Sequence, residues 1–293
     1  MINVLVTGGK GQLGQAIKSI GKDYKDQIAF TYCSSSELDI TNLDLVLDYM
    51  SLNSFDYCIN CAAYTHVDKA EEELEQAFEI NGHGVENLAV ACKTSNVILI
   101  HISTDFVFSG KQSYPYEETD IAEPLCVYGK SKLQGEMNIK KHLTKFYILR
   151  TSWLYSEFGA NFMKSMLRLG TEREALSIVF DQIGSPTYAV DLSKFVLHLV
   201  QNGSAQYGIY HYSNEGVASW YDFARAIFQK SGVTIDLKPI RSSEYPLPAK
   251  RPNYSVLDKG KLKRNFNITI PHWEDSLEIA LNKNNLLNKL QGY

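Results

Sequence analysis

The stretch INVLVTGGKGQLGQAIKSIG, residues 2–21, decides the fold class of this chain. It opens with the apolar run INVLVT, which is typical of a buried strand. The run passes directly into a turn in which Gly8, Gly11 and Gly14 recur at every third position. The residues after this turn have the apolar spacing of a helix. A strand, a glycine-rich turn and a helix in this order predict the first unit of a nucleotide-binding α/β fold.

The glycine turn has the chemistry of a pyrophosphate site. Glycines allow a tight turn and let a ligand approach the backbone closely. The helix that follows contributes unpaired N–H groups and a partial positive charge. We therefore predict a dinucleotide cofactor at this turn, and the alternative is a structural turn without a ligand. The residues expected to line the cofactor are Gly8, Lys10, Gly11, Gln12, Leu13 and Gly14.

Apolar runs alternate with helical patterns through the first half of the chain. Strands joined by helices run parallel, and nearly continuous apolar strands indicate a sheet that is covered on both faces. We predict an α/β fold, a Rossmann-type doubly wound parallel sheet with a smaller C-terminal substrate-binding lobe. The expected strands of the sheet are residues 2–8, 27–33, 55–62, 96–103 and 146–153.

The second half of the chain is less regular. Residues 176–182 are typical of one more strand and residues 191–203 of one more helix, whereas residues 243–258 are rich in tyrosine and proline. Such irregular chain is expected in a lobe that closes over the strand ends. We assign residues 1–150 to an NAD(P)-binding domain with a returning strand and helix near 176–202, and residues 151–175 and 203–293 to the substrate-binding lobe.

Composition and charge exclude several classes of protein. The 293 residues are 44% apolar and 21% charged, with a formal net charge of -4 and no basic stretch. Such a chain is globular and lacks the basic surface that nucleic-acid binding needs. No apolar run has the length of a membrane helix, and the N-terminus lacks the pattern of a signal peptide. We expect a cytoplasmic protein that binds neither nucleic acid nor a membrane.

The cysteines predict neither a disulfide framework nor a metal site. Their number, five, is odd, and Cys58 and Cys61 form the one C-x-x-C in the sequence. Residues three apart on a strand point to opposite faces, and no second pair completes four ligands. We interpret these thiols as core packing and expect no metal.

A phenol and an ammonium lie four residues apart in VYGKSKLQGE, residues 127–136. Of the 18 tyrosines only Tyr128 has a lysine, Lys132, four residues later, although chance spacing is an alternative. Residues four apart share one face of a helix. Thr104 and Asp105 follow the fourth strand, at the edge where open α/β sheets bind ligands. A hydroxyl, a phenol and an ammonium at one edge predict a proton relay.

These segments resemble the extended short-chain dehydrogenase/reductase superfamily and, within it, the dTDP-4-dehydrorhamnose reductase family. The resemblance covers nearly the whole chain, and the AAYTHVDKAE, TSWLY and GSPTY stretches are specific to the family rather than to the superfamily. The segments that carry it are TGGKGQLG, LDIT, INCAAYTHVDKAE, ISTDFVF, YGKSKLQGE, LRTSWLY, NFMKSML, DQIGSPTY and RPNYSVLD.

The resemblance implies the reduction of a nucleotide-sugar ketone. In that reaction NAD(P)H delivers a hydride to C4 of dTDP-4-dehydro-6-deoxy-L-mannose, and the product is dTDP-L-rhamnose. Tyr128 would donate the proton, while Lys132 would lower the pKa of the phenol and hold the nicotinamide ribose. Thr104 would hydrogen-bond the substrate oxygen. Asp105 would either tune the site or cap the local turn.

Further site residues follow from the motifs that match the family. Val67, Trp153 and Arg251 are expected at the substrate, Arg251 on its diphosphate. The alternatives are core packing for Trp153 and an ion pair between the lobes for Arg251. His66 and His101 are interpreted as packing residues. The residues expected at the cofactor, beside the glycine turn, are Asp39, Ile40, Ala62, Ala63 and Tyr64.

The segment CSSSELD, residues 33–39, bears on the choice of cofactor. A carboxylate about 20 residues after the glycine turn grips the ribose 2′-hydroxyl of NAD in such folds. Ser34, Ser35 and Ser36 occupy that place and Glu37 comes late, so a 2′-phosphate need not be repelled. We predict NADPH, with NADH tolerated.

Three other functions are alternatives to the reductase. A 4,6-dehydratase of this fold would place a glutamate after Thr104 and Asp105, where this chain has Phe106. A nucleotide-sugar 4-reductase of other stereochemistry would carry the same motifs. A non-catalytic NADP-binding regulatory subunit, like the β subunit of methionine adenosyltransferase, would not need the intact relay.

The C-terminal tail bears on assembly. Some reductases of this kind dimerise around Mg²⁺ held by C-terminal glutamates, but residues 281–293 contain no glutamate. We therefore expect a monomer or a weak homodimer, with a small-molecule nucleotide sugar as the partner.

Overall fold

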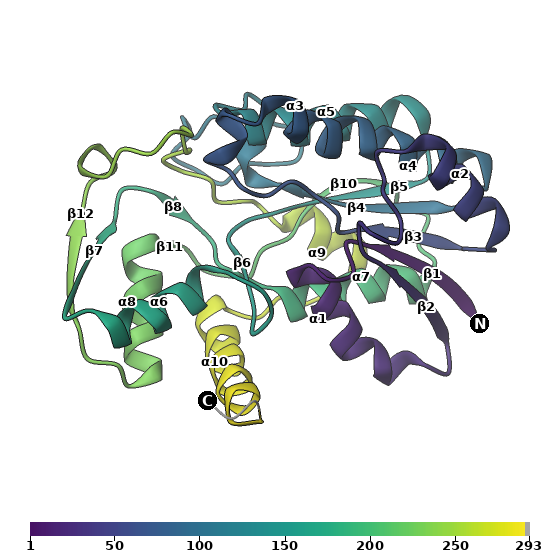
Figure 1. Cartoon of the computed structure of the whole chain (residues 1–293). Coiled ribbons are helices and arrows are strands. Elements are labelled where there is room, and N and C mark those ends of the chain that lie inside the picture. The colour runs from purple at the N-terminus through teal and green to yellow at the C-terminus, as the bar shows by residue number, and fades with distance from the viewer. Residues whose placement is uncertain (291–293) are drawn as a thin grey trace.

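A six-stranded parallel sheet forms the centre of the molecule (Figure 1). The computed structural model describes residues 1–290, and side chains through residue 284. The strand order is β10-β5-β4-β3-β1-β2, which confirms the predicted doubly wound α/β fold. The strands are β1 (Ile2–Thr7), β2 (Ile28–Cys33), β3 (Tyr57–Asn60), β4 (Ile98–Thr104), β5 (Phe146–Thr151) and β10 (Gly208–His211).

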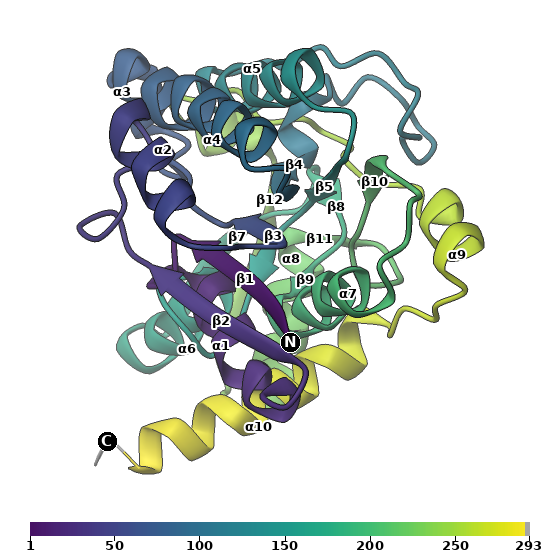
Figure 2. The same ribbon diagram turned by 90° about the vertical axis from the view of Figure 1, so that its right-hand side faces the viewer.

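Helices cover both faces of the sheet, as Figure 2 shows. Successive residues of β1 are buried on opposite faces, which is the reason for its continuous apolar run. Leu5 packs with α2 (Leu43–Leu52), α4 (Gly84–Thr94) and α5 (Val127–His142). Val4 and Val6 pack with α1 (Gln12–Gly21) and α7 (Ala189–Asn202). The predicted helix near residues 191–203 therefore does return to the sheet.

The connection between β3 and β4 is helical but not uniform. A 3₁₀ turn, η2 (Lys69–Glu71), precedes α3 (Leu74–Phe78) and a π-helical segment, η3 (Glu79–His83), which continues into α4. Buried Asn81 in η3 donates to the carbonyl of Tyr64 at 3.0 Å and to Ser131 at 3.0 Å. The π-helical segment thus ties the loop after β3 to α5, and such segments are frequent near functional sites.

The second lobe is assembled from segments that are distant in the sequence. α6 (Phe162–Glu172) packs against α8 (Trp220–Ser231) beside three two-stranded sheets. The paired strands are β6 (Leu154–Tyr155) with β9 (Thr187–Tyr188), β7 (Ala175–Val179) with β12 (Asp236–Ile240), and β8 (Ile183–Gly184) with β11 (Ala218–Ser219). The remaining helices are η1 (Lys22–Tyr24), η4 (Asp105–Val107), η5 (Ser242–Glu244), α9 (Gly260–Phe266) and α10 (Trp273–Leu290).

The strand expected near residues 176–182 does not return to the central sheet, so that prediction is wrong. Ala175–Val179 pairs with β12 in the second lobe, and the sixth strand of the sheet is β10 instead. β10 has four residues at the edge of the sheet, too few for an apolar pattern to be recognised. The apolar run near residue 176 does form a strand, but local sequence does not specify its partner.

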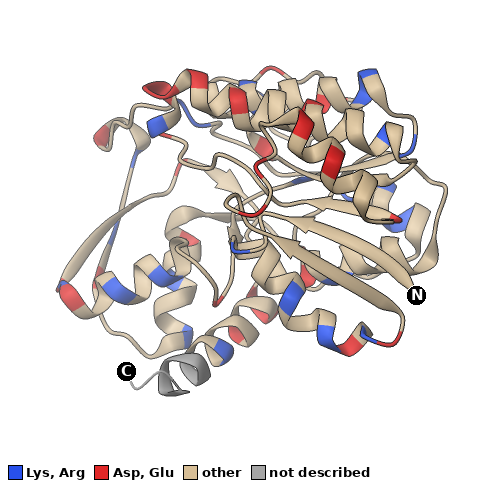
Figure 3. Ribbon diagram, turned by 45° about the vertical axis from the view of Figure 1, so that its right-hand side comes forward, with Lys and Arg blue, Asp and Glu red and all other residues tan. Residues whose placement is uncertain are grey.

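Charged positions are intermixed along the helices of both lobes (Figure 3). Within residues 1–290 no helix has both the length and the apolar character needed to cross a membrane.

Candidate active site

A cavity of about 640 Å³ lies at the carboxyl ends of the sheet strands. Its walls come from the glycine turn, the segments after β3 and β4, the first turns of α5 and the second lobe. Parallel strands end at one edge of a sheet, so side chains that are distant in the sequence meet there. The predicted site residues that line this cavity are Lys10, Gly11, Gln12, Leu13, Ala63, Val67, Thr104, Asp105, Tyr128, Lys132, Trp153 and Arg251.

Close backbone contacts build the glycine turn. Gly8 has a φ of +66°, and a Cβ on it would lie 2.6 Å from the nitrogen of Ala62. A Cβ on Gly14 would lie 2.5 Å from the carbonyl oxygen of Gly8. These two glycines pack the turn together and against the loop after β3, whereas Gly11 lines the cavity.

The first turn of α1 is suited to an anion. α1 begins at Gln12 with no cap from any described side chain and with no acidic residue in its first turn. Its first N–H groups therefore point toward the cavity edge without a side-chain acceptor, as in helix N-termini that bind phosphate.

The side chain of Gln12 joins the glycine turn to the second lobe. Its Nε2 donates to the carbonyl of Leu154 at 3.2 Å. Its Oε1 accepts from Ser156 Oγ at 3.0 Å and from Asn161 Nδ2 at 2.9 Å. We call these three contacts the Gln12 clasp, which was not apparent from the sequence because its members are far apart along the chain.

Thr104, Tyr128 and Lys132 lie together at the end of β4 and the start of α5. Lys132 is 2% exposed, and its Nζ donates to the carbonyl of Ile102 at 2.6 Å. The Tyr128 ring packs edge-on against Phe106 with centroids 5.6 Å apart, and its hydroxyl is within hydrogen-bonding reach of Thr104. The structure thus brings the three predicted relay residues into one place.

Burial governs the ionisation of the relay residues. Desolvation lowers the pKa of Lys132 to about 8, although Glu136 and Cys61 oppose this shift. Desolvation also raises the pKa of Tyr128 well above its ordinary value, and the hydrogen bond with Thr104 opposes that shift. The phenol is therefore protonated at neutral pH, which is the form that a general acid requires.

Asp105 is a buried carboxyl group at the edge of the cavity. It is 2% exposed, and desolvation raises its pKa to about 6 against hydrogen bonds from Ser255 and Thr104. Its Oδ2 has no hydrogen-bond partner among the described residues. The side chain that caps η4 is that of Thr104, whose Oγ1 accepts from the Phe106 N–H at 3.2 Å.

Two stacked tryptophans form one wall of the cavity. Trp153 and Trp220 have ring centroids 3.6 Å apart and planes inclined by 7°. Trp153 has a φ of +46°, which is uncommon outside glycine and is often found at ligand sites. Gly184 makes room for it, since a Cβ there would lie 2.7 Å from the indole ring. Trp220 is not predictable as a site residue, because nothing near it in the sequence marks it as a partner of Trp153.

Arg251 forms the ion pair that was the alternative to a substrate contact. Its guanidinium donates to both carboxylate oxygens of Asp68, at 2.9 and 2.7 Å, and the hydrogen bonding lowers the pKa of Asp68. The pair joins the loop after β3 to the second lobe. Arg251 also lines the cavity, so a contact with substrate stays a prediction.

Six predicted cofactor residues, all in the described part of the chain, lie outside the cavity lining. Asp39 accepts from the Thr41 N–H at 3.0 Å, and the Tyr64 hydroxyl donates to Glu73 at 2.5 Å. Both side chains are therefore engaged in local contacts, and a role at the cofactor stays a prediction. The six residues are Gly8, Gly14, Asp39, Ile40, Ala62 and Tyr64.

The end of β2 carries one negative charge, Glu37, with positive charge near it. The Glu37 carboxylate accepts from the Ser34 N–H at 2.7 Å and from Ser34 Oγ at 2.6 Å. These hydrogen bonds lower the pKa of Glu37, and nearby Lys10 and Lys18 lower it further. The carboxylate is therefore ionised and engaged by Ser34, and Lys10 and Lys18 are positive charges near it.

The structure gives no sign of a metal centre within the described residues. No group of three or more His, Cys, Asp or Glu side chains there could hold an ion. Cys58 is buried and Cys61 lines the cavity, so this pair faces opposite sides. In the tail, the side chains after residue 284 and all of residues 291–293 lie outside the described part. The expected absence of a metal and the expected assembly state stay predictions.

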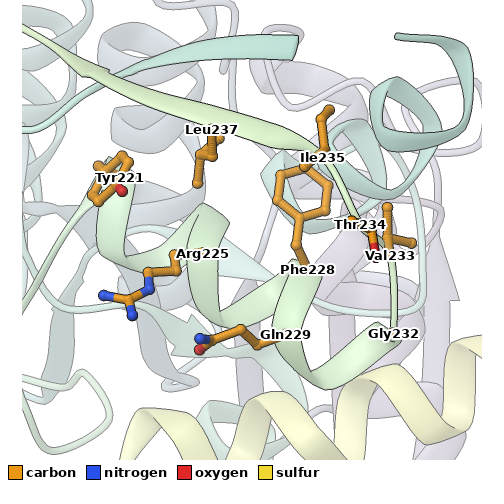
Figure 4. A pocket seen from close by; sticks show the side chains of 9 residues that line it. All are labelled: Tyr221, Arg225, Phe228, Gln229, Gly232, Val233, Thr234, Ile235 and Leu237. Carbon is orange, nitrogen blue, oxygen red and sulfur yellow. The ribbon is translucent and has the colours of Figure 1, made fainter. Parts of the chain in front are cut away.

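A second cavity, of about 450 Å³, lies between α8 and the segment that leads into β12 (Figure 4). Tyr221, Arg225 and Gln229 project from α8, and apolar side chains such as Ile235 and Leu237 line the opposite side. None of the predicted site residues in the described chain lines it, and it does not combine an acid with a base.

The sheet, the glycine turn at the end of its first strand and the tyrosine–lysine pair define the chain as an extended short-chain dehydrogenase/reductase. Within that class, the RmlD substrate binding domain family matches residues 2–286. The chain belongs to this family.

Relatives and solved structures agree with the assignment. The dTDP-4-dehydrorhamnose reductase of Aggregatibacter actinomycetemcomitans is 41% identical over 288 residues, which are 95% of this chain and 98% of the relative. The dTDP-4-dehydrorhamnose reductase of Bacillus anthracis, solved in complex with NADP, has a TM-score of 0.93 at 39% identity and covers 97% of this chain and 100% of its own. That of Clostridium acetobutylicum has a TM-score of 0.93 at 39% identity and covers 96% and 99%.

Proposed function

We propose that this protein reduces the C4 keto group of dTDP-4-dehydro-6-deoxy-L-mannose with NADPH and forms dTDP-L-rhamnose. The observation that carries the proposal is the cavity in which Thr104, Tyr128 and Lys132 lie beside the glycine turn. The names of the relatives support the same reaction, and the Bacillus anthracis relative was solved with NADP.

The residues around the glycine turn fit a dinucleotide. The turn and the uncapped start of α1 would hold the pyrophosphate, with Lys10, Gly11, Gln12 and Leu13 against it. Gly8, Gly14, Ala62 and Tyr64 would support this turn, Asp39 and Ile40 would lie toward the adenine, and Ala63 toward the nicotinamide. The serine hydroxyls after β2 and Lys10 would accept a 2′-phosphate, with NADH tolerated. When bound, NADPH supplies the hydride.

The protein would supply the proton and stabilise the charge that develops on the substrate oxygen. Tyr128 would give its hydroxyl proton to that oxygen, and Thr104 Oγ1 would hydrogen-bond the same atom. Lys132, one helical turn from Tyr128, would stabilise the phenolate that remains and hold the nicotinamide ribose. General acid catalysis of this kind contributes about 10²–10⁴-fold to a rate.

The substrate would lie between the relay and the second lobe. The stacked pair of Trp153 and Trp220 offers a flat apolar wall for a sugar ring or base. Val67 and Asp105 line the same space. Arg251 would bind the diphosphate while Asp68 holds its guanidinium in place.

The turnover of NADPH tests this proposal. Wild type, Tyr128→Phe and Tyr221→Phe would be mixed with NADPH and dTDP-4-dehydrorhamnose generated in situ, and the near-ultraviolet absorbance of NADPH followed. We expect Tyr128→Phe to be slower by about a hundredfold or more, because it lacks the proton donor. Tyr221→Phe, in the second cavity, controls for the loss of a tyrosine hydroxyl on the same protein.

The alternatives predict different outcomes. A wild-type protein that binds NADPH without oxidising it would support the regulatory-subunit function. A product whose NMR spectrum shows the opposite configuration at C4 would support a reductase of other stereochemistry.

We further propose that residues 1–150 with α7 bind the cofactor and that the second lobe, within 151–175 and 203–293, binds the sugar. The protein would work in the cytoplasm as a monomer or weak homodimer, without nucleic acid or membrane as a partner. Light scattering of the purified protein across a concentration series measures the assembly state.

A further inference from the structure

A chain of buried polar groups runs beneath the cavity from β1 to Lys132. Thr7 Oγ1 donates to Asn60 Oδ1 at 2.7 Å, and Asn60 Nδ2 lies 3.0 Å from His101 Nδ1. His101 Nε2 in turn lies 3.4 Å from Lys132 Nζ. Thr7, Asn60 and His101 are each at most 1% exposed and occupy neighbouring strands. A packing role alone does not account for the two polar contacts of His101, with Asn60 and with Lys132.

The backbone fixes the orientation of the Asn60 amide. The N–H of Ala62 donates to Asn60 Oδ1 at 3.0 Å, and a backbone N–H can only donate. The atom that faces it is therefore the oxygen. Nδ2 is then the atom beside His101, and an amide nitrogen is a donor. His101 Nδ1 must accept this hydrogen bond and carries no proton.

The proton of the imidazole therefore resides on the nitrogen that faces Lys132. Burial and the nearby Lys132 hold the pKa of His101 well below its ordinary value, so the ring is neutral. A neutral imidazole has one N–H, and with Nδ1 accepting from Asn60 this N–H is on Nε2. His101 thus presents a donor to the nitrogen of Lys132.

A donor at this position distinguishes between the two forms of Lys132. An ammonium has three protons and no lone pair, so it meets the His101 N–H with an N–H of its own. An uncharged amine accepts from His101 and still donates to the carbonyl of Ile102 at 2.6 Å. The amine satisfies both neighbours, whereas the ammonium satisfies one of them.

Other influences on Lys132 both lower and raise its pKa. Burial favours the amine, while Glu136 on the same helix and Cys61 after β3 favour the ammonium, and the balance is a pKa of about 8. Tyr128 precedes Lys132 by one turn of α5. The Glu136 carboxylate is shared with Arg150 and Ser103. From β4, Lys132 meets the imidazole of His101 and the carbonyl of Ile102.

We propose that His101 is a positioning residue that, fixed by Asn60, shifts the equilibrium of Lys132 toward the uncharged amine, and that an anionic cofactor shifts it back toward the ammonium. The tautomer and its effect on Lys132 stand on the geometry alone, while the catalytic consequence rests on the proposed function. Lys132 would then bind its proton more tightly when the cofactor is present, which is when Tyr128 needs a cation beside it.

NMR tests the tautomer without any turnover. A two-bond ¹H–¹⁵N spectrum of ¹⁵N-histidine-labelled protein shows which ring nitrogen carries the proton, and the spectrum of His101→Asn identifies the signals of His101. We expect the proton on Nε2. A signal set with the proton on Nδ1 would overturn the proposal even if the protein proves to be an active reductase.

The alkaline limb of the pH profile of kcat/KM tests the effect on Lys132. His101→Asn keeps an acceptor for Asn60 but removes the N–H that faces Lys132, and His101→Gln can turn an amide oxygen toward it. We expect either variant to move this limb to a higher pH by about one unit, because Lys132 then keeps its proton to a higher pH. One pH unit is a tenfold change in the ionisation constant of Lys132.

A control variant separates tuning from a structural role. His211→Asn removes another fully buried imidazole, one that does not line the cavity, and should leave the limb in place. A lower kcat or lower stability in both His101 variants with an unmoved limb would show that His101 only supports the fold. If His101→Asn does not fold, the pH profile of His101→Gln and the tautomer of His101 in the wild type test the proposal instead.

Discussion

Helix α5 carries two buried charges four residues apart, and their surroundings differ. Glu136 accepts from Arg150 at 2.9 and 2.7 Å and from Ser103 at 2.5 Å. Lys132, within the described residues, donates to one carbonyl and faces the imidazole of His101. A buried charge that is fully paired is held in its ionised form, whereas an under-paired one is easily neutralised. One helix thus holds a structural charge and a charge whose state can change.

Replacement of Lys132 gives the largest expected effect. Lys132→Met should lower kcat by about 10²–10⁴-fold, because the phenolate of Tyr128 loses its cation. The midpoint of thermal unfolding should fall only slightly, because removal of a desolvated cation offsets the loss of the hydrogen bond to the carbonyl of Ile102. Both quantities can be measured on one preparation, with the exposed Lys140→Met as the control on the same helix. A large drop in the midpoint would show that Lys132 is structural after all.

Replacement of Arg150 should affect mainly stability. Arg150→Met leaves Glu136 buried without its ion pair, and breaking such a pair costs about 3–5 kcal/mol. The free energy of unfolding from urea titrations measures this loss. Addition of Glu136→Gln in the same chain should recover part of it. Equal stability of wild type and Arg150→Met would contradict the structural role of the pair.

Asp105 extends the comparison to a second under-paired charge. Its pKa is raised to about 6 from 3.8, so the folded protein binds more protons than the unfolded chain between these values. Stability therefore falls as pH rises through that interval, by up to about 3 kcal/mol. Asp105→Asn should lack this decrease. Unfolding free energies of both proteins at about pH 4 and about pH 7 give the difference, and identical slopes would refute it.

An exposed ion pair should give the smallest effect. Arg168 and Glu172 on α6 lie 2.6 Å apart, but their side chains are 61% and 48% exposed. Arg168→Ala should change the free energy of unfolding by less than about 0.5 kcal/mol, because water screens the pair. A comparison with Arg150→Met shows whether burial or contact geometry determines how much an ion pair contributes to the free energy of unfolding. A loss comparable to that of Arg150→Met would break the comparison.

The central sheet and the relay were predictable because both depend on short stretches of sequence. The apolar strands β1 and β4 are recognisable by themselves, and Thr104 directly follows such a run. Tyr128 and Lys132 share one helix face by their spacing alone. The fold class and the grouping of these three residues therefore needed no knowledge of tertiary contacts.

The remaining features depend on contacts between distant segments. Trp220 gains its place only by stacking on Trp153, and His101 gains a polar role only because Asn60 and Lys132 flank it. Tryptophan and histidine occur in many buried positions, so the residue type alone does not indicate either role. The partner of each residue is defined only in the folded chain. The edge strand β10 was missed for the same reason, since its pairing with β5 defines it.

The Gln12 clasp has a consequence for how this protein is made. Gln12 leaves the ribosome early, but two of its partners, Leu154 and Asn161, follow it by 142 and 149 residues. A nascent chain that ends before Leu154 has its whole glycine turn but lacks all three contacts that fix it. Nucleotide affinity during synthesis should thus rise late, and it would report that more than half of the chain has emerged rather than that the first βαβ unit has folded.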